Sequence, residues 1–317
     1  MKHKRYLITG CNGFIGSHMA RRLLSEKEVE VIALVNGDTQ SLSFAEERLE
    51  IIEFDILNQD RLDRILAEHR VEHVLHLAAQ SSIPEGWHRP KNTLEINAIG
   101  TFNLLHCLYR LRFAGRILVV GAGAEYGYMD PGEDPIGEDK VFRPTSIYGV
   151  SKIASDMLGY FFGRSLGLGV VRVRPFNVSG PGKVGDACSD FARGIAGVER
   201  GSARELRVGN LNAVRDYIDV RDAVEGMLTA LHNGEVGECY NLCSGQGHRI
   251  GEILEILLKL SNFNITVIKD KNKLRPVDEP IDIGANYRLR SLGWKPKIPL
   301  EKTLEDTLNF WRMSPDP

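Results

Sequence analysis

The sequence of 317 residues predicts an α/β protein with a doubly wound parallel sheet and a smaller, mixed α/β lobe. Three observations support this fold class. Short apolar runs alternate with helical patterns from residue 5 to about residue 120, as in parallel sheets with helices on both faces. A glycine-rich turn joins the first run to the first helix. The second half alternates less regularly and contains no low-complexity linker, so we expect its lobe to be woven from several segments.

The composition, with 43% hydrophobic and 26% charged residues, is ordinary for a globular enzyme. A net charge of −2 argues against a nucleic-acid or membrane surface built on bulk charge. The five cysteines form no CxxC pair, and Cys239 and Cys243 have no histidine at a fitting spacing, which predicts free thiols and no metal site. Without a signal-peptide core or a membrane span, the expected location is the cytoplasm.

The first expected strand, residues 6–8, ends in a turn with glycines at three-residue intervals. Gly10 allows the tight bend, Gly13 lets the backbone approach a diphosphate, and Gly16 lets the following helix lie close to the strand. The start of that helix offers free N–H groups and a positive dipole end to an anion. This context predicts a dinucleotide site in a Rossmann-like sheet. The alternative is an incidental glycine turn.

Three further strand ends are expected to surround the same ligand. The strand 29–35 ends at Val35-Asn36 rather than at an acid, which slightly favours NADP over NAD, although no arginine follows immediately. Asp55-Ile56 follows the strand 49–54, where the acid accepts from an adenine amine or forms part of a helix N-cap near Asn58. The strand 71–77 ends in the small residues Ala78-Ala79, which permit close approach of a ligand.

The remaining patterns predict further elements in both halves. The expected helices cover residues 59–67, 91–111, 148–162, 191–200, 219–231, 250–260 and 300–311. The expected strands cover residues 116–120, 170–174, 205–208 and 239–243. We assign residues 1–175, with returning segments at about 213–246, to the dinucleotide-binding domain. Residues 176–212 and 247–317 are assigned to a substrate-binding lobe.

Tyr148 and Lys152 lie four residues apart and therefore share one face of the helix expected to run to residue 162. A nearby ammonium lowers the pKa of a phenol. The phenol can then exchange a proton with a carbon-bound oxygen while a hydride moves to or from nicotinamide. The alternative is an exposed helix turn without a catalytic role. The glycine turn at residue 10 favours catalysis.

The motifs Thr9-Gly10-x-x-Gly13-x-x-Gly16, Asn97, Tyr148-x-x-x-Lys152 and Arg174-Pro175-Phe176-Asn177 together resemble the extended short-chain dehydrogenase/reductase family over nearly the whole chain. The second half resembles its nucleotide-sugar-modifying branch, and within it the enzymes acting on GDP-linked sugars. The segments that carry this likeness are 177–182, 208–211, 214–216 and 274–276. The second half resembles the GDP-4-keto-6-deoxymannose reductases, and also the GDP-mannose 4,6-dehydratases.

The resemblance implies two sets of ligand contacts and a catalytic pair, Tyr148 and Lys152. The implied cofactor-binding residues are Gly10, Asn12, Gly13, Phe14, Ile15, Asn36, Asp55, Ile56, Leu77, Ala78, Ala79, Asn97, Tyr148 and Lys152. The implied substrate-binding residues are Ser81, Ser82, Glu125, Asn177, Val208, Asn210, Arg215 and Arg275. The arginines would meet the diphosphate or nucleoside of the nucleotide sugar, unless they form surface ion pairs instead. Asn177 and Ser82 would meet the sugar phosphate or ring.

Apolar residues in 97–108 and 151–162 fit the homodimer that is common in this family, or else burial within one subunit.

The sequence departs from the family pattern at two positions. Ala122 stands where the family carries Ser or Thr four residues before Tyr126, and a lost hydrogen bond to the reacting oxygen costs about 10²-fold in rate. Ser81 or Ser82 could substitute for the missing hydroxyl. Ala124 stands where the dehydratases place an acid, and Glu125, one residue later on an extended segment, is expected to point elsewhere. This makes 4,6-dehydration an unfavoured reaction.

The favoured hypothesis is an oxidoreductase that transfers a hydride between nicotinamide and C4 of a nucleotide-linked sugar, in particular a reductase of 4-keto-6-deoxy sugars. A 4-dehydrogenase or a 4-epimerase is the alternative within the same chemistry. A hypothesis from another class is a catalytically impaired protein that binds the cofactor or the sugar nucleotide, which Ala122 motivates. Neither a nucleic acid nor a membrane is an expected partner.

Overall fold

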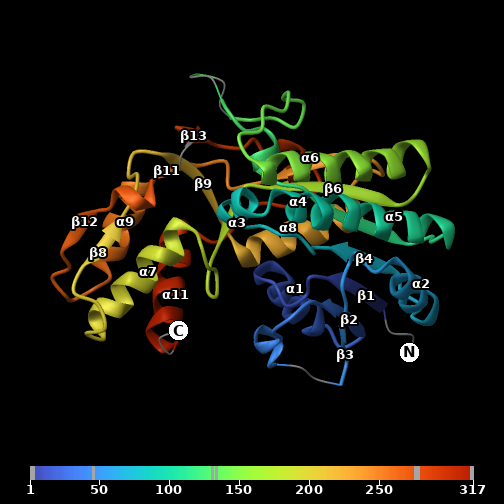
Figure 1. Cartoon of the computed structure of the whole chain (residues 1–317), viewed down its shortest axis with the longest axis horizontal. Helices are drawn as coiled ribbons and strands as arrows, with labels where there is room; N and C mark the ends of the chain where they lie inside the picture. The colour runs from blue at the N-terminus through green and yellow to red at the C-terminus, as the bar shows by residue number, and fades with distance from the viewer. Residues whose placement is uncertain (1–3, 45–46, 130–131, 133–134, 275–278, 315–317) are drawn as a thin grey trace.

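The structure is a computed structural model that describes residues 4–44, 47–129, 132, 135–274 and 279–314. A large part holds a parallel sheet between layers of helices, and a smaller lobe stands beside it (Figure 1). Seven parallel strands in the order β10-β6-β5-β4-β1-β2-β3 confirm the predicted fold class. They are β1 (Lys4–Thr9), β2 (Val29–Val35), β3 (Leu49–Glu53), β4 (His73–His76), β5 (Arg116–Val120), β6 (Val170–Pro175) and β10 (Cys239–Leu242).

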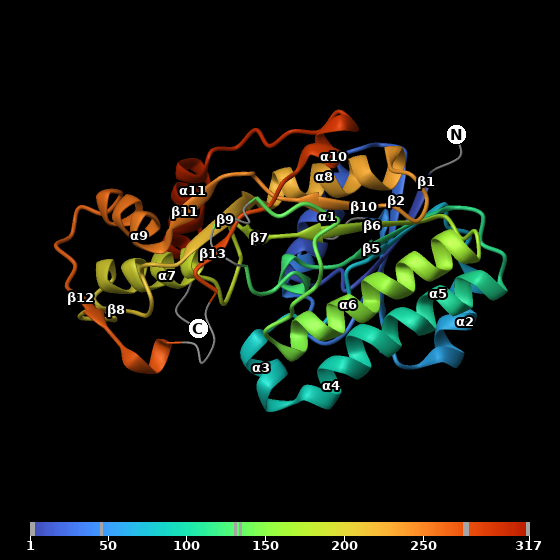
Figure 2. The ribbon, with the colours of Figure 1, turned by 90° about the horizontal axis from the view of Figure 1, so that it is seen from above.

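Alternating side chains along the strands build one apolar core on each face of this sheet. Tyr6 and Ile8 of β1 belong to a core with residues of α1 and α8, whereas Leu7 between them belongs to a core with residues of α2 and α5. On that second face α6 packs beside α5 (Figure 2). These helices are α1 (Phe14–Leu24), α2 (Gln59–Glu68), α5 (Gly100–Arg110), α6 (Ile147–Tyr160) and α8 (Val220–Asn233).

The helix predicted over 91–111 consists of α4 (Pro90–Leu94), the π-helical turn η2 (Glu95–Ile99) and α5. The π turn carries Asn97, and such turns are frequent at functional sites. The short helix α3 (Ile83–His88) precedes it. Other short helical turns are η1 (Gln40–Leu42), η3 (Gly123–Glu125), η4 (Phe161–Ser165) and η5 (Lys271–Lys273). No helix within the described ranges combines the length and apolar character that crossing a bilayer requires.

The lobe has two small sheets and a core of its own. One sheet joins β7 (Asn177–Ser179), β9 (Val214–Asp219), β11 (Gly247–Arg249) and β13 (Ile281–Asp282), and the other joins β8 (Leu206–Val208) and β12 (Val267–Lys269). The helices α7 (Ala187–Glu199), α9 (Ile250–Lys259) and α11 (Leu300–Met313) pack against one another beside these sheets.

The boundary between the two parts differs from the predicted one in two places. The segment 213–246 divides, because β9 pairs within the small sheet while α8 and β10 join the large part. Conversely, α10 (Tyr287–Ser291), which we assigned to the lobe, packs against α8 and β10. Leu289 and Trp294 complete the apolar core around α8, and no local pattern in the sequence marks such a distant contact.

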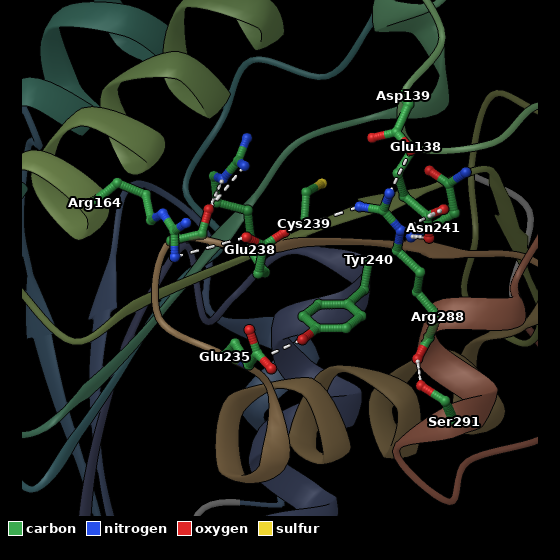
Figure 3. A network of polar contacts seen from close by, with 12 residues as sticks. Glu138, Asp139, Arg164, Glu235, Glu238, Cys239, Tyr240, Asn241, Arg288 and Ser291 are labelled. Atoms are coloured by element: carbon green, nitrogen blue, oxygen red, sulfur yellow. Dashed lines mark hydrogen bonds and ion pairs between the residues drawn. The ribbon is translucent and has the colours of Figure 1, made fainter.

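Arg288 of α10 fastens the segment 135–146, which leads into α6, to the edge of the large sheet (Figure 3). Its Nε lies 3.7 Å from Glu138 Oε2, its Nη1 lies 3.9 Å from Glu238 Oε2, and it also pairs with Asp139. Glu138 in turn accepts the backbone N–H of Asn241 at 2.9 Å. The start of α6 is therefore held from the far side of the sheet.

Candidate active site

A cavity of about 740 Å³ opens beyond the carboxyl ends of the large sheet and reaches the small sheet of the lobe. Ligands of open α/β sheets bind at this edge. Residues that follow β1, β2, β3, β4, β5 and β6 line the cavity, together with residues of β9 and β13. A ligand in this cavity would therefore contact both parts of the molecule.

The glycine turn has the geometry that a diphosphate cradle requires. Gly10 has φ +66°, and a Cβ there would lie 2.7 Å from Ala78 Cα. A Cβ at Gly16 would collide with the backbone oxygen of Gly10 and lie 2.8 Å from Cys11 Cα. No side chain caps the N-terminus of α1, whose first residues line the cavity. These residues fit a dinucleotide cofactor, because backbone N–H groups and the helix dipole are open to an anion.

The residues predicted to bind the cofactor all line the cavity except Asn97. Asn97 is 1% exposed, so its predicted contact with the cofactor is replaced by a role beneath the cavity. Its amide accepts the backbone N–H of Gln80 at 2.7 Å, donates to the backbone oxygen of Gln80 at 3.0 Å and donates to Ser151 Oγ at 2.8 Å. Asn97 thus ties the loop after β4 to the helix that carries Tyr148.

Asn36 and Asp55 lie in the lining at the ends of β2 and β3. Asn12 holds the first of these loops, because its Nδ2 donates to the backbone oxygens of Asn36 at 2.9 Å and Asp38 at 2.8 Å. The N-cap of α2 is Asn58, which accepts from the backbone N–H of Arg61, so Asp55 is not the capping residue. Asp55 instead accepts the backbone N–H of Leu57 at 3.0 Å and faces the cavity.

Tyr148 and Lys152 both line the cavity from the first turns of α6. Ser146 caps this helix by accepting the backbone N–H of Gly149 at 3.1 Å. Lys152 is 5% exposed and donates from Nζ to the backbone oxygen of Val120. Burial lowers the pKa of Lys152 to about 8, against the opposing effect of nearby carboxylates. Burial raises the pKa of Tyr148, so the phenol keeps its proton at neutral pH.

Glu125 does not line the cavity, which agrees with the expectation that it points elsewhere and argues against the substrate contact that the resemblance implies. It is fully buried, and its carboxylate accepts the backbone N–H of Ala122 at 2.7 Å and pairs with Arg174 Nε at 3.0 Å. Ala122 and Ala124 do line the cavity. That wall therefore offers methyl groups and backbone, with neither a hydroxyl nor a carboxylate from these three residues.

The predicted substrate residues divide into two groups. Ser81, Asn177 and Arg215 line the cavity. Ser82, Val208 and Asn210 are absent from its lining, and Arg275 lies outside the described residues. Ser82 caps α3, Val208 is buried in the core of the lobe, and Asn210 accepts the backbone N–H of Asn212 at 3.0 Å.

Sequence reasoning missed several polar residues of the lining. Gln80, Asn92, Lys183, Glu279 and Asp282 all belong to it. Gln80 follows directly from the rule on strand ends and could have been found. Glu279 and Asp282 are brought there by the pairing of β13 with β9, which no short-range pattern encodes. Among the described residues, no group of three or more metal-ligating side chains gathers in a metal-binding arrangement.

The glycine turn, the strand ends around it and the Tyr148–Lys152 pair define an NAD(P)-dependent enzyme of the extended short-chain dehydrogenase/reductase class. Comparison with known families narrows this class. The family model described as GDP-mannose 4,6 dehydratase matches residues 7–307. The chain therefore belongs to this family of nucleotide-sugar-modifying enzymes.

Individual relatives agree with this assignment. GDP-6-deoxy-D-mannose reductase of Pseudomonas aeruginosa is 32% identical over 97% of both chains. The structure of RMD from Pseudomonas aeruginosa complexed with NADPH has a TM-score of 0.84 and 32% identity, and the match covers 98% of this chain and 99% of that one. UDP-glucose 4-epimerase of Thermus thermophilus, in complex with NAD, has a TM-score of 0.87 and 28% identity over 98% and 99% of the chains.

Proposed function

We propose that this protein reduces the 4-keto group of a nucleotide-linked 6-deoxy sugar, with GDP as the nucleotide. One observation carries the proposal: Tyr148 and Lys152 line the same cavity as the glycine turn. The likeness to GDP-6-deoxy-D-mannose reductase of Pseudomonas aeruginosa, over nearly the full length of both chains, supports the choice of substrate.

In this proposal Tyr148 is the general acid. A bound nicotinamide would supply the hydride, and the phenol would donate its proton to the C4 oxygen as that oxygen gains charge. The raised pKa of Tyr148 keeps the proton available at neutral pH. Lys152, one helical turn away, carries a positive charge below its pKa of about 8 and stabilises the phenolate that remains.

The part of the cavity wall formed by residues 122–124 supports reduction over 4,6-dehydration. Expulsion of water from the sugar needs an acid or base beside the reacting carbons. Ala124 lines the cavity at the position where the resemblance predicts that acid, and Glu125 is buried against Arg174. The segment 122–125 therefore supplies no carboxylate to the substrate.

The test is to incubate the purified protein with GDP-4-keto-6-deoxymannose and NADPH or NADH and to follow the absorbance of the reduced nicotinamide. We expect its consumption to match the alcohol formed. Tyr148→Phe should lower the rate by about 10³-fold. The matched control is Tyr287→Phe, an exposed tyrosine of α10 outside the lining of the cavity, which should leave the rate unchanged. An undiminished rate in Tyr148→Phe would refute the assigned role.

Two specific observations favour second candidates. The high TM-score with UDP-glucose 4-epimerase favours epimerisation or 4-dehydrogenation. Epimerisation would be detected as conversion of UDP-glucose to its C4 epimer. 4-Dehydrogenation would be detected as reduction of NAD(P) in the presence of a nucleotide sugar that carries a C4 hydroxyl. Ala122 in the lining favours a binding protein, which would retain nucleotide sugars without turning them over.

We propose NADPH as the preferred cofactor. Support comes from the end of β2, where Asn36, rather than an acid, lines the cavity, and from the NADPH complex of the Pseudomonas aeruginosa structure. A kcat/KM for NADH equal to or above that for NADPH would contradict this preference.

We also propose a homodimer formed through α5 and α6, which lie side by side at the surface (Figure 2). Their outer faces and the adjoining η2 and η4 carry exposed apolar side chains. These are Ile99, Phe102, Tyr109, Met157, Tyr160 and Phe161. Exposed patches of this kind mark protein interfaces. Light scattering should give twice the chain mass for the wild type and the monomer mass for Phe161→Glu; a monomeric wild type would contradict the proposal.

A further inference from the structure

The side of the cavity formed by the lobe carries a cluster of three polar residues, Asn177, Arg215 and Asp282. Asn177 begins β7, and the register places Asp282 of β13 beside Arg215 of β9. Asp282 accepts a hydrogen bond from Asn177 at 3.1 Å. Three short strands from distant parts of the sequence thus converge on one face of the cavity.

Two acceptors fix the orientation of the Asn177 side-chain amide. Its Nδ2 donates to Asp282 Oδ2 at 3.1 Å and to the backbone oxygen of Asp216 at 3.2 Å. A rotated amide would place its oxygen against a carboxylate and a carbonyl, neither of which donates a hydrogen bond. Both N–H groups are therefore used within the protein. Oδ1, which accepts no hydrogen bond from a described residue, is the polar atom that Asn177 has left for a ligand.

An amide oxygen selects hydrogen-bond donors. Phosphate oxygens of a diphosphate are acceptors at neutral pH, so this oxygen cannot bind them directly. Glu279, also in the lining, adds a carboxylate that accepts from Thr145 Oγ1, three residues before Tyr148. Glu279 is therefore tied to the segment that leads into α6, and its wall shares the cavity with Tyr148, where the sugar ring must be for its C4 oxygen to receive a proton.

We infer that Asp282 is a positioning residue, which holds Asn177 so that its side-chain oxygen accepts a hydrogen bond from a hydroxyl group of the sugar ring. The inference rests on the proposed function only in placing a sugar beside Tyr148. It assigns Asn177 to the sugar rather than to the phosphate, and it leaves the diphosphate to cationic groups of the lining such as Lys183 and Arg215.

Asp282→Asn tests the inference, because a second amide can either donate to or accept from Asn177 and so permits the rotated orientation. Calorimetry should compare GDP-mannose with GDP, and UDP-glucose with UDP, without any turnover. We expect the variant to bind the sugar nucleotide about tenfold more weakly, as for one lost hydrogen bond, and to bind the free nucleotide within about twofold of wild type. Asp306→Asn, on α11 and outside the lining, is the matched control and should change neither affinity.

A double variant, Asn177→Asp with Asp282→Asn, exchanges the two side chains. Residue 177 then presents a carboxylate oxygen, a hydrogen-bond acceptor, to the ligand, so part of the affinity for the sugar nucleotide should return. The recovery should be incomplete, because the new carboxylate faces the backbone oxygen of Asp216. Equal weakening of sugar nucleotide and free nucleotide in Asp282→Asn, or no weakening, would overturn the inference alone. Failure of the wild type to bind any sugar nucleotide would overturn the proposed function as well.

Discussion

Glu125→Gln should move the alkaline limit of activity to lower pH, because Glu125 helps to keep the buried Lys152 charged. Burial lowers the pKa of Lys152 to about 8, while the carboxylates of Glu125 and Asp156 act in the opposite direction. Of the other titratable groups near Lys152, Tyr148 is protonated at neutral pH and His76 is uncharged, since burial lowers its pKa to about 3. Asp156 and Glu125 therefore supply the balancing negative charge, although burial and the nearby Asp156 raise the pKa of Glu125, against the opposing effect of Arg174.

The expected size of the effect follows from the pKa of Lys152. A fall from 10.5 to about 8 corresponds to about 3 kcal/mol against the charged form, a net value that already includes the help of both carboxylates. An opposite charge in such a site is worth about one pKa unit or more. Without Glu125 the pKa of Lys152 should fall further, so that the alkaline limit of activity moves down by about one pH unit.

The assay is the pH profile of kcat/KM for the wild type, Glu125→Gln and the control Glu235→Gln. Glu235 precedes β10 and is absent from the lining of the cavity, and its removal also subtracts one negative charge. Breaking the buried pair with Arg174 should cost about 3 kcal/mol of unfolding free energy, which urea unfolding measures. A folded Glu125→Gln with an unchanged alkaline limit would refute the reasoning.

Three further variants test separate parts of the structure. Gly16→Ala would place a Cβ against the backbone oxygen of Gly10, so cofactor affinity measured by calorimetry should fall at least tenfold; unchanged affinity would contradict the cradle. Ala122→Ser adds a hydroxyl to the cavity wall and should raise kcat by about tenfold; an unchanged kcat would contradict the need for a hydroxyl at this position. Burial raises the pKa of Asp282 from 3.8 to about 6, so the native state binds this proton more tightly and the wild type loses stability as pH rises through that range. Asp282→Asn should therefore be up to about 3 kcal/mol more stable than wild type at pH 7 and equal to it below pH 4 in urea unfolding; a less stable variant at pH 7 would contradict this.

The sequence predicts the large sheet well because each of its strands is a local apolar run with clear ends. The predicted strands 29–35 and 116–120 agree with β2 and β5 at both ends. The four-stranded sheet of the lobe was not predicted, because most of its strands are not local apolar runs with clear ends. Strands of two or three residues, such as β7 and β13, are too short to show a period, and their partners lie tens of residues away.

The two sides of the cavity also differ in how far local sequence patterns predict them. Its cofactor half follows from strand ends and a glycine turn, which are local features, and these predicted residues line the cavity apart from Asn97. The lobe half depends on tertiary pairing, so Glu279 and Asp282 could not be predicted. Glu125 was misplaced because a carboxylate close in sequence to the cavity is drawn under it by Arg174, a partner that the sequence does not reveal.

Arg174 explains how the cofactor side of the cavity keeps its shape. Its guanidinium pairs with Glu125 at 3.0 Å and with Asp156 Oδ2 at 2.7 Å, and donates to Tyr126 Oη at 2.8 Å and to the backbone oxygen of Glu138 at 3.1 Å. These partners belong to the wall after β5, to α6 and to the segment that leads into α6. A buried guanidinium between two carboxylates is held in one arrangement, because moving it away would leave buried charges unpaired. α6, which carries Tyr148, and the wall after β5 are therefore fixed together. The lobe wall is held less tightly, because Asn177 is fixed there by a single carboxylate and one carbonyl.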